Sequence, residues 1–163
     1  MDTTEYLQAL RQRLAPYYDF KPANTEKLAF ELIAECNHAE EAYFLAKSIK
    51  LYGINNNEYI YLHALPNALD ANTWEKYCTY IINKIRNLQP DKEHMSSIFH
   101  LVFLISSPLD RVLHPAINKF KFHKDHSFTL KGWSDLSIII VELPNQVITT
   151  NKLGAKSIKN FQL

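Results

Sequence analysis

Helical spacing dominates the hydrophobic residues of the first ninety positions. An Asp2–Glu5 capping box, followed by leucines at intervals of three and four, predicts a helix over residues 3–15. A longer stripe predicts a second helix over residues 73–88, with one face directed into the core. This stripe consists of Trp74, Tyr77, Cys78, Ile81, Ile85 and Leu88.

The stretch between these helices contains two ambiguous segments. Residues 25–53 carry helical spacing with a fresh capping signal at Asn37, so they predict either two helices or one helix kinked near Asn37. Residues 58–65 predict a short helix, or a strand, because Tyr59-Ile60-Tyr61 favours extended structure. The N-terminal half is therefore expected to be mostly helical.

From residue 98 onwards the hydrophobic pattern changes in character. Residues 98–105 and 136–143 are apolar at nearly every position, which is typical of strands buried on both faces. Residues 147–150 predict a short additional strand. The C-terminal half is therefore expected to form a sheet.

A hairpin is predicted between the two buried strands. Residues 119–123 and 126–131 alternate between apolar and polar side chains, and they favour a turn at Lys124-Asp125. Residues 109–118 and the basic tail 151–163 carry no clear pattern.

Together these elements predict a single α+β domain over residues 1–163. Residues 1–90 would supply mostly helices, and these would pack on a mainly antiparallel sheet formed by residues 98–150. The basic tail over residues 151–163 would follow the sheet.

Composition supports an ordinary globular domain. Apolar residues make up 47% and charged residues 21% of the 163 positions, which excludes a disordered chain. Three glycines are too few for a glycine-rich phosphate loop or a turn-dense sandwich. No run approaches the roughly 20 apolar residues of a membrane span. Cys36 and Cys78 fall on predicted helical stripes, which indicates two buried reduced thiols and a cytoplasmic protein.

Charge is distributed unevenly along the chain. Residues 1–97 hold 10 Lys/Arg and 13 Asp/Glu, whereas residues 98–163 hold 8 Lys/Arg and 4 Asp/Glu. The net charge of +1 therefore divides into −3 and +4. This asymmetry permits an anionic partner at the C-terminal half without requiring one.

His123, Asp125 and His126 form the best local cluster for chemistry. Two imidazoles and a carboxylate in a hairpin turn could transfer protons, or bind a metal with help from His100 or His114. A plain polar hairpin tip fits the same residues, and we favour it because no established ligand spacing is present. We therefore expect neither a metal nor a cofactor.

A second candidate is a binding surface formed by Lys119, Lys121, Lys124 and Trp133. Lysines next to phenylalanines are found on nucleic-acid-binding surfaces, but here the alternation places Phe120 on the opposite face from the lysines. An edge strand whose lysines prevent aggregation is the simpler interpretation.

Two short motifs lie near the end of the chain, Ser134-Asp135-Leu136 and Val141-Glu142-Leu143-Pro144. On these motifs the stretch 95–145, about a third of the chain, resembles the C-terminal part of recombination-promoting nucleases of the PD-(D/E)XK transposase group. The lysine of a Glu-x-Lys motif is absent after Glu142, and the family's catalytic acids lie upstream of the similar stretch and have no match here. The resemblance therefore implies at most a nuclease remnant without activity.

Three functions remain open, in order of preference. The first is a non-catalytic protein-binding domain, such as a small immunity or antitoxin-type inhibitor or effector that masks a partner protein. It is favoured because the sequence contains none of the common catalytic motifs. The second is a metal-assisted hydrolase or nuclease that uses His123, Asp125 and His126. The third is a nucleic-acid-binding domain that uses the lysines of the C-terminal half, tail lysines included. A membrane partner is not expected, and the sequence leaves the oligomeric state open.

Overall fold

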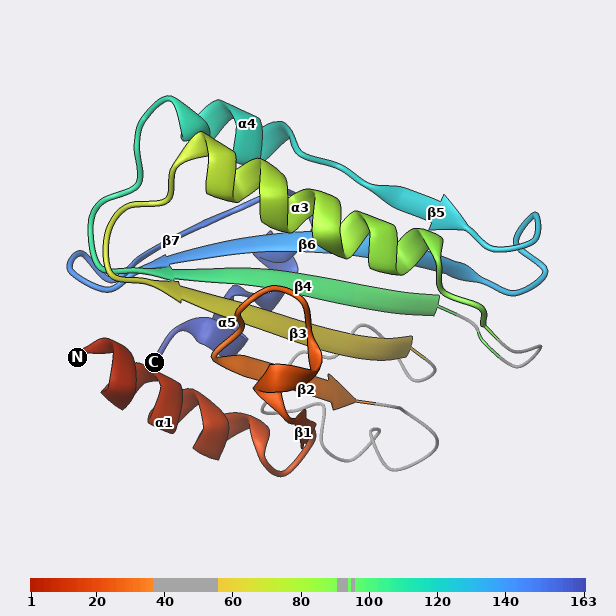
Figure 1. Cartoon of the computed structure of the whole chain (residues 1–163), viewed down its shortest axis with the longest axis horizontal. Helices are drawn as coiled ribbons and strands as arrows, with labels where there is room; N and C mark the ends of the chain where they lie inside the picture. Colours follow the sequence, from red (N-terminus) through yellow and green to blue (C-terminus); the bar gives the residue numbers. More distant parts are fainter. Residues whose placement is uncertain (37–55, 91–93, 95) are drawn as a thin grey trace.

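A computed structural model describes residues 1–36, 56–90, 94 and 96–163. In this described part of the chain, seven strands form one mixed sheet between two layers of helices (Figure 1). The strands are β1 (Asp19–Lys21), β2 (Leu32–Cys36), β3 (Asn56–Leu65), β4 (Ser96–Ile105), β5 (His123–Asp125), β6 (Trp133–Glu142) and β7 (Val147–Thr150). The helices are α1 (Thr3–Leu14), α3 (Ala71–Arg86), α4 (Leu113–Lys119) and α5 (Ile158–Phe161), with the short 3-10 helices η1 (Ala23–Thr25) and η2 (Gly154–Ser157).

The sheet has the strand order β1-β2-β3-β4-β6-β5, and β7 also pairs with β6. Its two longest pairings, β3 with β4 and β4 with β6, are parallel, whereas the outer pairings are antiparallel. Parallel neighbours require a crossover, and α3 and α4 lie in the two crossover connections. The crossover helices α3 and α4 cover one face of the central strands, and α1 and α5 cover the other.

The predicted fold class, α+β, agrees with this architecture, but the predicted arrangement is wrong. Three of the strands, β1, β2 and β3, lie within the half of the chain that was expected to be helical. The sheet is mixed rather than mainly antiparallel, with a parallel centre. The reason is that β3 and β4 are both buried strands separated by a helix, and that order builds a parallel unit.

The segment 25–36 shows why the helical prediction failed. Residues 32–36 form β2, which is buried on both faces at nearly every position. A short apolar run of this kind has no alternation, so its periodicity cannot distinguish a strand from a helix. Residues 58–65 belong to β3, so the strand alternative for that segment is confirmed. The helix predicted to start at Asn37 lies outside the described residues.

Several local predictions are confirmed. The Asp2–Glu5 capping box is present at the start of α1. The buried residues of α3 are five of the six predicted stripe residues: Trp74, Tyr77, Cys78, Ile81 and Ile85. The strands predicted over 98–105, 136–143 and 147–150 correspond to β4, β6 and β7.

Alternation along the central strands divides the core into two hydrophobic clusters. Phe103 of β4 packs with α3 and α4 on one face, and the next residue, Leu104, belongs to the cluster that includes α1 and α5 on the other. Figure 1 shows α3 and α4 on one side of the sheet and α1 on the opposite side. Among the described helices, none is both long and apolar enough to cross a membrane.

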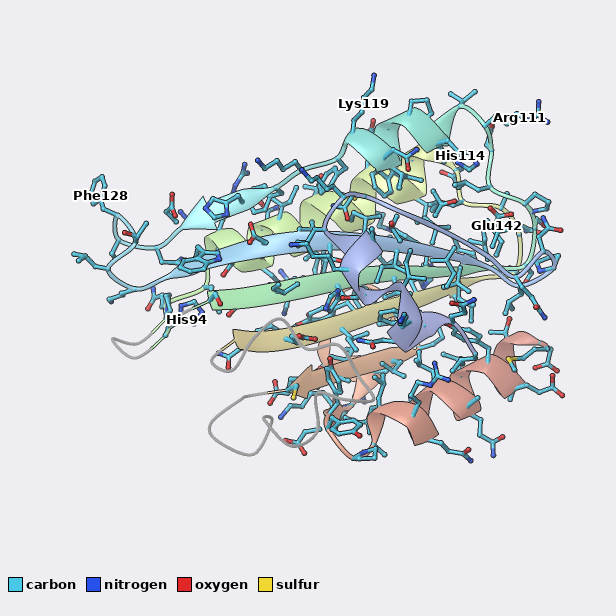
Figure 2. All side chains as sticks on the ribbon, turned by 180° about the vertical axis from the view of Figure 1, so that it is seen from behind. His94, Arg111, His114, Lys119, Phe128 and Glu142 are labelled. Atoms are coloured by element: carbon cyan, nitrogen blue, oxygen red, sulfur yellow. The ribbon has the colours of Figure 1, made fainter. Side chains whose placement is uncertain are left out.

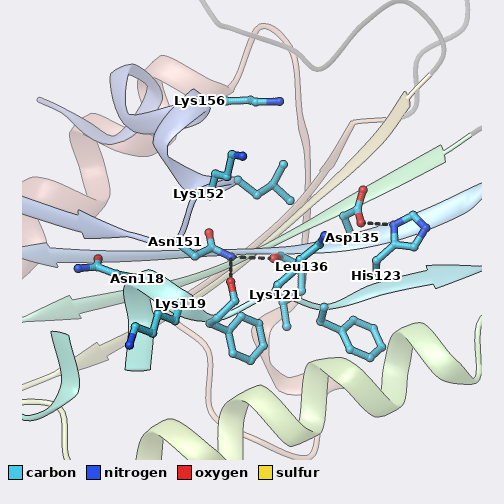
Figure 3. Close-up of a pocket in the computed structure, with 12 residues that line it drawn as sticks. Asn118, Lys119, Lys121, His123, Asp135, Leu136, Asn151, Lys152 and Lys156 are labelled. Carbon is cyan, nitrogen blue, oxygen red and sulfur yellow. Dashed lines mark hydrogen bonds and ion pairs between the residues drawn. The ribbon is translucent and has the colours of Figure 1, made fainter. Parts of the chain in front are cut away.

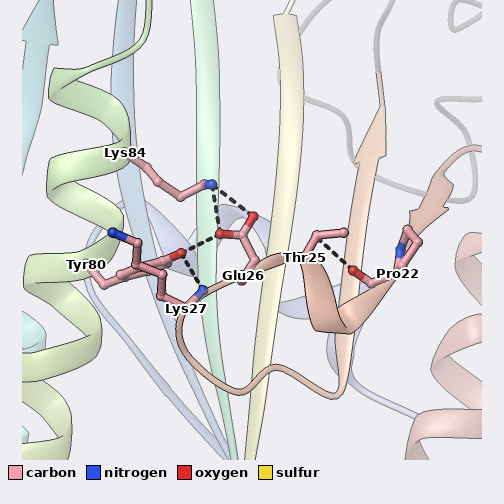
Figure 4. Close-up of polar contacts among 6 residues, drawn as sticks. All are labelled: Pro22, Thr25, Glu26, Lys27, Tyr80 and Lys84. Carbon is pink, nitrogen blue, oxygen red and sulfur yellow. Dashed lines mark hydrogen bonds and ion pairs between the residues drawn. The ribbon is translucent and has the colours of Figure 1, made fainter.

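The Glu26 carboxylate links the loop before β2 to α3. Glu26 accepts hydrogen bonds from the Tyr80 hydroxyl at 2.5 Å and from Lys84 Nζ at 2.9 Å (Figure 4). Burial raises the pKa of Glu26, but these two donors outweigh it and hold the pKa below its ordinary value. The carboxylate is therefore charged at neutral pH and joins two segments distant in sequence.

The C-terminal segment 151–163 is part of the core rather than a separate tail. It forms η2 and α5, and Phe161 is buried in the cluster with α1. The Tyr6 hydroxyl donates a hydrogen bond of 2.6 Å to the Phe161 carbonyl. The two ends of the chain therefore pack against each other.

Candidate functional site

An apolar tip projects from the connection between β5 and β6. Phe128 is 96% exposed and Leu130 81% exposed, and Trp133 at the start of β6 is 41% exposed. Figure 2 shows Phe128 at the outer end of this connection, directed away from the rest of the protein. We call Phe128, Leu130 and Trp133 the apolar tip.

The position of this tip corrects the predicted hairpin. Residues 126–131 form the connection itself rather than a strand, and the turn lies beyond Lys124-Asp125. The alternation of 126–131 predicted that Phe128 and Leu130 face the core, whereas the structure places both side chains in solvent. No sequence signal indicates their exposure, because a half-buried strand and this loop share the same alternating pattern.

The backbone of the tip has an unusual conformation. Ser127, Phe128 and Thr129 have φ values of 52°, 55° and 70°, in the left-handed region that non-glycine residues rarely enter. The loop is closed by backbone hydrogen bonds from His126 N–H to the Gly132 carbonyl at 2.9 Å and from Lys131 N–H to the His126 carbonyl at 3.1 Å. The tip is thus presented on a closed loop with strained backbone.

His126 anchors the base of the loop. It is only 4% exposed, and its Nε2 lies 2.8 Å from Ser134 Oγ on β6. Its ring meets the His94 ring edge to face, with centroids 5.6 Å apart. Burial, followed by the nearby His94 and Lys124, holds the pKa of His126 below its ordinary value, so the ring is neutral at pH 7.

His94 completes this anchor, and the sequence analysis missed it. Its Nδ1 lies 2.6 Å from the Lys131 carbonyl, and its Nε2 lies 2.7 Å from Ser97 Oγ on β4. A carbonyl only accepts, so the ring donates to it through Nδ1, and Ser97 Oγ lies within hydrogen-bonding distance of Nε2. The loop is therefore linked to the beginnings of both β4 and β6.

His123 occupies a different environment from His126. Its Nδ1 lies 2.5 Å from Asp135 Oδ1, and its Nε2 lies 3.1 Å from Asp125 Oδ1. Two acceptors facing two ring nitrogens favour the doubly protonated ring. The bond to Asp135 accordingly raises the pKa of His123, with Asp125 adding to the effect.

The structure does not join His123, Asp125 and His126 into one reactive cluster. Asp125 contacts His123, but His126 is buried against Ser134. The proposed helper His100 lies in β4, with its Nε2 3.4 Å from Glu58 Oε2. His114 lies on α4.

Metal-binding groups are also dispersed. Within the described residues, no three or more His, Cys, Asp or Glu side chains are grouped so that they could hold a metal ion. Asp135 and Glu142, the acids of the nuclease-like motifs, are at opposite ends of β6. They are seven positions apart on extended strand, a separation of roughly 23 Å and too far for one metal.

The predicted binding lysines fall into two places. Lys119 and Lys121 line a cavity of about 500 Å³ together with His123 and two lysines of the C-terminal segment, Lys152 and Lys156 (Figure 3). Lys124 lies in β5, next to the loop that carries the apolar tip, and Trp133 belongs to that tip. The predicted set is therefore divided between a basic cavity and an apolar projection.

The chain was also compared with known proteins. No curated protein and no solved structure matches it. A family model described as "Domain of unknown function (DUF8052)" matches residues 2–163, and the chain therefore belongs to this family.

Proposed function

We propose that the chain is a non-catalytic protein-binding domain whose apolar tip inserts into an apolar cleft of a partner protein. The observation that carries the proposal is the exposure of Phe128 and Leu130 on a closed loop. Full burial of such side chains contributes about 1.5–3 kcal/mol each. The folded chain leaves these side chains in solvent and does not gain this free energy, whereas burial in the cleft of a partner would provide it.

The conformation of the loop supports the same interpretation. Residues held in the left-handed region cost on the order of 1–3 kcal/mol each, and Phe128 and Thr129 both adopt it. Backbone strain of this kind clusters at binding sites, where a fixed shape reduces the entropy lost on association. An aromatic side chain already held outward is the usual form of an interface anchor.

Charge around the tip indicates the character of the partner. Lys131 lies within the loop, Lys124 lies on β5 beside it, and the nearby Asp125 is engaged by His123. A cleft with an apolar floor and an acidic rim would complement this arrangement. We propose that the protein masks such a cleft, as a small inhibitor of immunity or antitoxin type would do.

A cytoplasmic location is part of this proposal. Cys36 and Cys78 are both buried thiols, and burial raises the pKa of each to about 12. Thiols of this kind are unreactive and suit a reducing compartment.

The test compares a tip variant with a matched control in affinity capture. The variant Phe128→Ser with Leu130→Ser removes the two exposed anchors, and Val112→Ser removes an exposed apolar residue that lies outside the tip. Each tagged protein is incubated with lysate of its own host, and captured proteins are quantified by mass spectrometry. We expect one stoichiometric protein that the wild type and Val112→Ser retain and the tip variant loses by at least about tenfold.

Two outcomes would contradict the proposal. One is a partner that the tip variant still captures at the wild-type level, since its binding would not use the tip. The other is the absence of any protein captured in proportion to the bait, together with tip-dependent binding of lipid vesicles. All three substitutions are at exposed positions, so melting temperatures close to the wild type are expected for both variants and would exclude unfolding as the cause.

A further inference from the structure

We propose that the basic cavity at the edge of β6 binds a small molecule through its phosphate groups. We call this cavity the lysine pocket, and its cationic residues are Lys119, Lys121, Lys152 and Lys156. The apolar tip does not contribute to its lining, so this proposal goes beyond the proposed function and is independent of it.

The pocket lies at a gap in the edge of the sheet. On the side of β6 away from β4, β5 pairs with residues 133–135 and β7 pairs with residues 139–142, so the stretch between them has no neighbouring strand on that side. Asn151 fills this gap with its side chain. Its Oδ1 accepts from Ile138 N–H at 3.0 Å, and its Nδ2 donates to the Leu136 carbonyl at 3.1 Å. The edge of β6 is therefore satisfied and does not offer hydrogen bonds to an added peptide strand.

Asn151 also fixes the two walls of the pocket. Its Nδ2 donates to the Phe120 carbonyl at 3.3 Å, and its Oδ1 accepts from Gly154 N–H at 2.8 Å. A Cβ atom at position 154 would lie 2.4 Å from the Ile138 carbonyl oxygen, so only glycine permits this approach. The wall with Lys119 and the wall with Lys152 are thus held at a fixed separation by one buried amide (Figure 3).

The pocket carries a concentrated positive charge. Four lysines and one aspartate line it, which gives a net charge of +3 before His123 is counted. Among the described residues, no carboxylate forms a salt bridge with Lys119, Lys121 or Lys152. The single aspartate, Asp135, is turned to His123. Ammonium groups are strong donors to phosphate oxygens, and unpaired ones retain that capacity.

The orientation of the aromatic side chains in the lining favours phosphate groups, rather than a nucleobase, as the part of the ligand that binds here. The Phe120 ring packs against Trp74 with centroids 5.6 Å apart, and the Phe122 ring lies under the Arg86 guanidinium at 5.7 Å. These contacts direct both rings to α3, so their faces do not form a platform on which bases could stack. A volume of about 500 Å³ suits a small ligand better than an extended strand.

The test measures binding of inorganic pyrophosphate by calorimetry at fixed ionic strength. The pocket variant Lys121→Gln with Lys152→Gln removes one charge from each wall. The control variant Lys76→Gln with Lys159→Gln removes the same charge from exposed positions that do not line the pocket. We expect a saturable one-to-one complex that the pocket variant weakens at least about tenfold and the control variant changes less than about twofold.

Equal weakening in both variants would overturn the proposal, because the attraction would then arise from net charge alone. Failure of pyrophosphate to bind the wild type in a saturable manner would overturn it as well. The same titration with a single-stranded DNA oligonucleotide provides the third arm. Tighter binding of the oligonucleotide, with a steep salt dependence that both variants share, would assign the lysines to a nucleic-acid surface instead.

Discussion

At the scale of single residues, two histidines only three positions apart have opposite properties. His123 is partly exposed and faces two carboxylates, whereas His126 is buried against a hydroxyl and next to a second imidazole. The first environment favours the imidazolium and the second favours the neutral ring. Sequence proximity alone suggested a shared role for these rings, but their surroundings separate them.

A pH titration followed by NMR should show this separation. We expect the imidazole signals of His123 to titrate above pH 6.5, because the hydrogen bond to Asp135 raises its pKa, and those of His126 to titrate below 6.5, because burial lowers its pKa. The variant Asp135→Asn should move the titration of His123 towards lower pH and leave His126 nearly unchanged. Overlapping titrations of the two rings in the wild type would contradict the assigned environments.

The same shifts have opposite consequences for stability. The pKa of His123 is raised on folding, so its stabilising contribution is complete below the unfolded value of about 6.5 and is lost as the pH rises through the folded pKa. The pKa of His126 is lowered, so its protonation favours unfolding, and the related stability is complete above about pH 6.5 and declines below it. Acidification below about pH 6.5 should therefore lower the stabilising contribution of the buried, neutral His126 ring.

At the scale of elements, α3 is the part of the chain that its own sequence specifies most strongly. Its N-terminus is capped by Asp70, whose side chain accepts from Thr73 N–H at 2.8 Å. One face packs on the sheet through Ile81 and Ile85, which are fully buried. Periodicity and burial agree here, which is why this helix could be predicted, although it begins at Ala71 after an Asp70 cap rather than after Asn72.

A charge on this buried stripe should unfold the domain. Ile81→Asp would place an unpaired carboxylate at a fully buried position. We therefore expect this variant to be unfolded at physiological temperature and to show no cooperative transition on heating. Thr79→Asp, on the exposed side of the same helix, should change the free energy of unfolding by no more than about 0.5 kcal/mol. Circular dichroism during heating measures both, and a wild-type melting curve for Ile81→Asp would refute the packing of α3.

Agreement between local signals was weaker at β2 and in the connection between β5 and β6. The run Leu32-Ile33-Ala34 is buried throughout, so it lacks the alternation that identifies a strand. The connection after β5 does alternate, yet Phe128 and Leu130 project into solvent. In both segments the neighbours in space, rather than the period, determine the structure.

At the scale of the whole molecule, Asn151 joins segments that no local pattern relates. All four hydrogen-bonding positions of its amide are used, by the backbone of Leu136, Ile138, Gly154 and Phe120. This single side chain closes the sheet edge, orders the start of the C-terminal segment and separates the walls of the lysine pocket.

Replacement of this amide by an acid of the same shape should be strongly destabilising. Asn151→Asp loses both donors and places a carboxylate next to two carbonyl oxygens, so we expect a loss of about 3 kcal/mol or more. Asn67→Asp makes the same chemical change at an exposed position and should alter the stability by less than about 0.5 kcal/mol. Urea denaturation measures both values, and similar midpoints for the two variants would show that the Asn151 amide is not a structural bridge.

Features that depend on neighbours along the chain could be predicted from the sequence alone. The capping box of α1, the stripe of α3 and the strands β4, β6 and β7 all follow from local periodicity and punctuation. Each of these signals is contained within about fifteen residues, so no knowledge of the partner element was needed.

Four features arise from tertiary contacts instead: the parallel centre of the sheet, the strand at β2, the outward direction of the apolar tip, and the lysine pocket that gathers Lys119, Lys121, Lys152 and Lys156. These features depend on which strands pair and on what covers each face. Burial and hydrogen bonding between segments outweigh local preference, because most of the stabilising free energy of a domain comes from contacts between elements. The candidate binding surfaces belong to this second group, and for that reason the sequence pattern named some of their residues without placing them together.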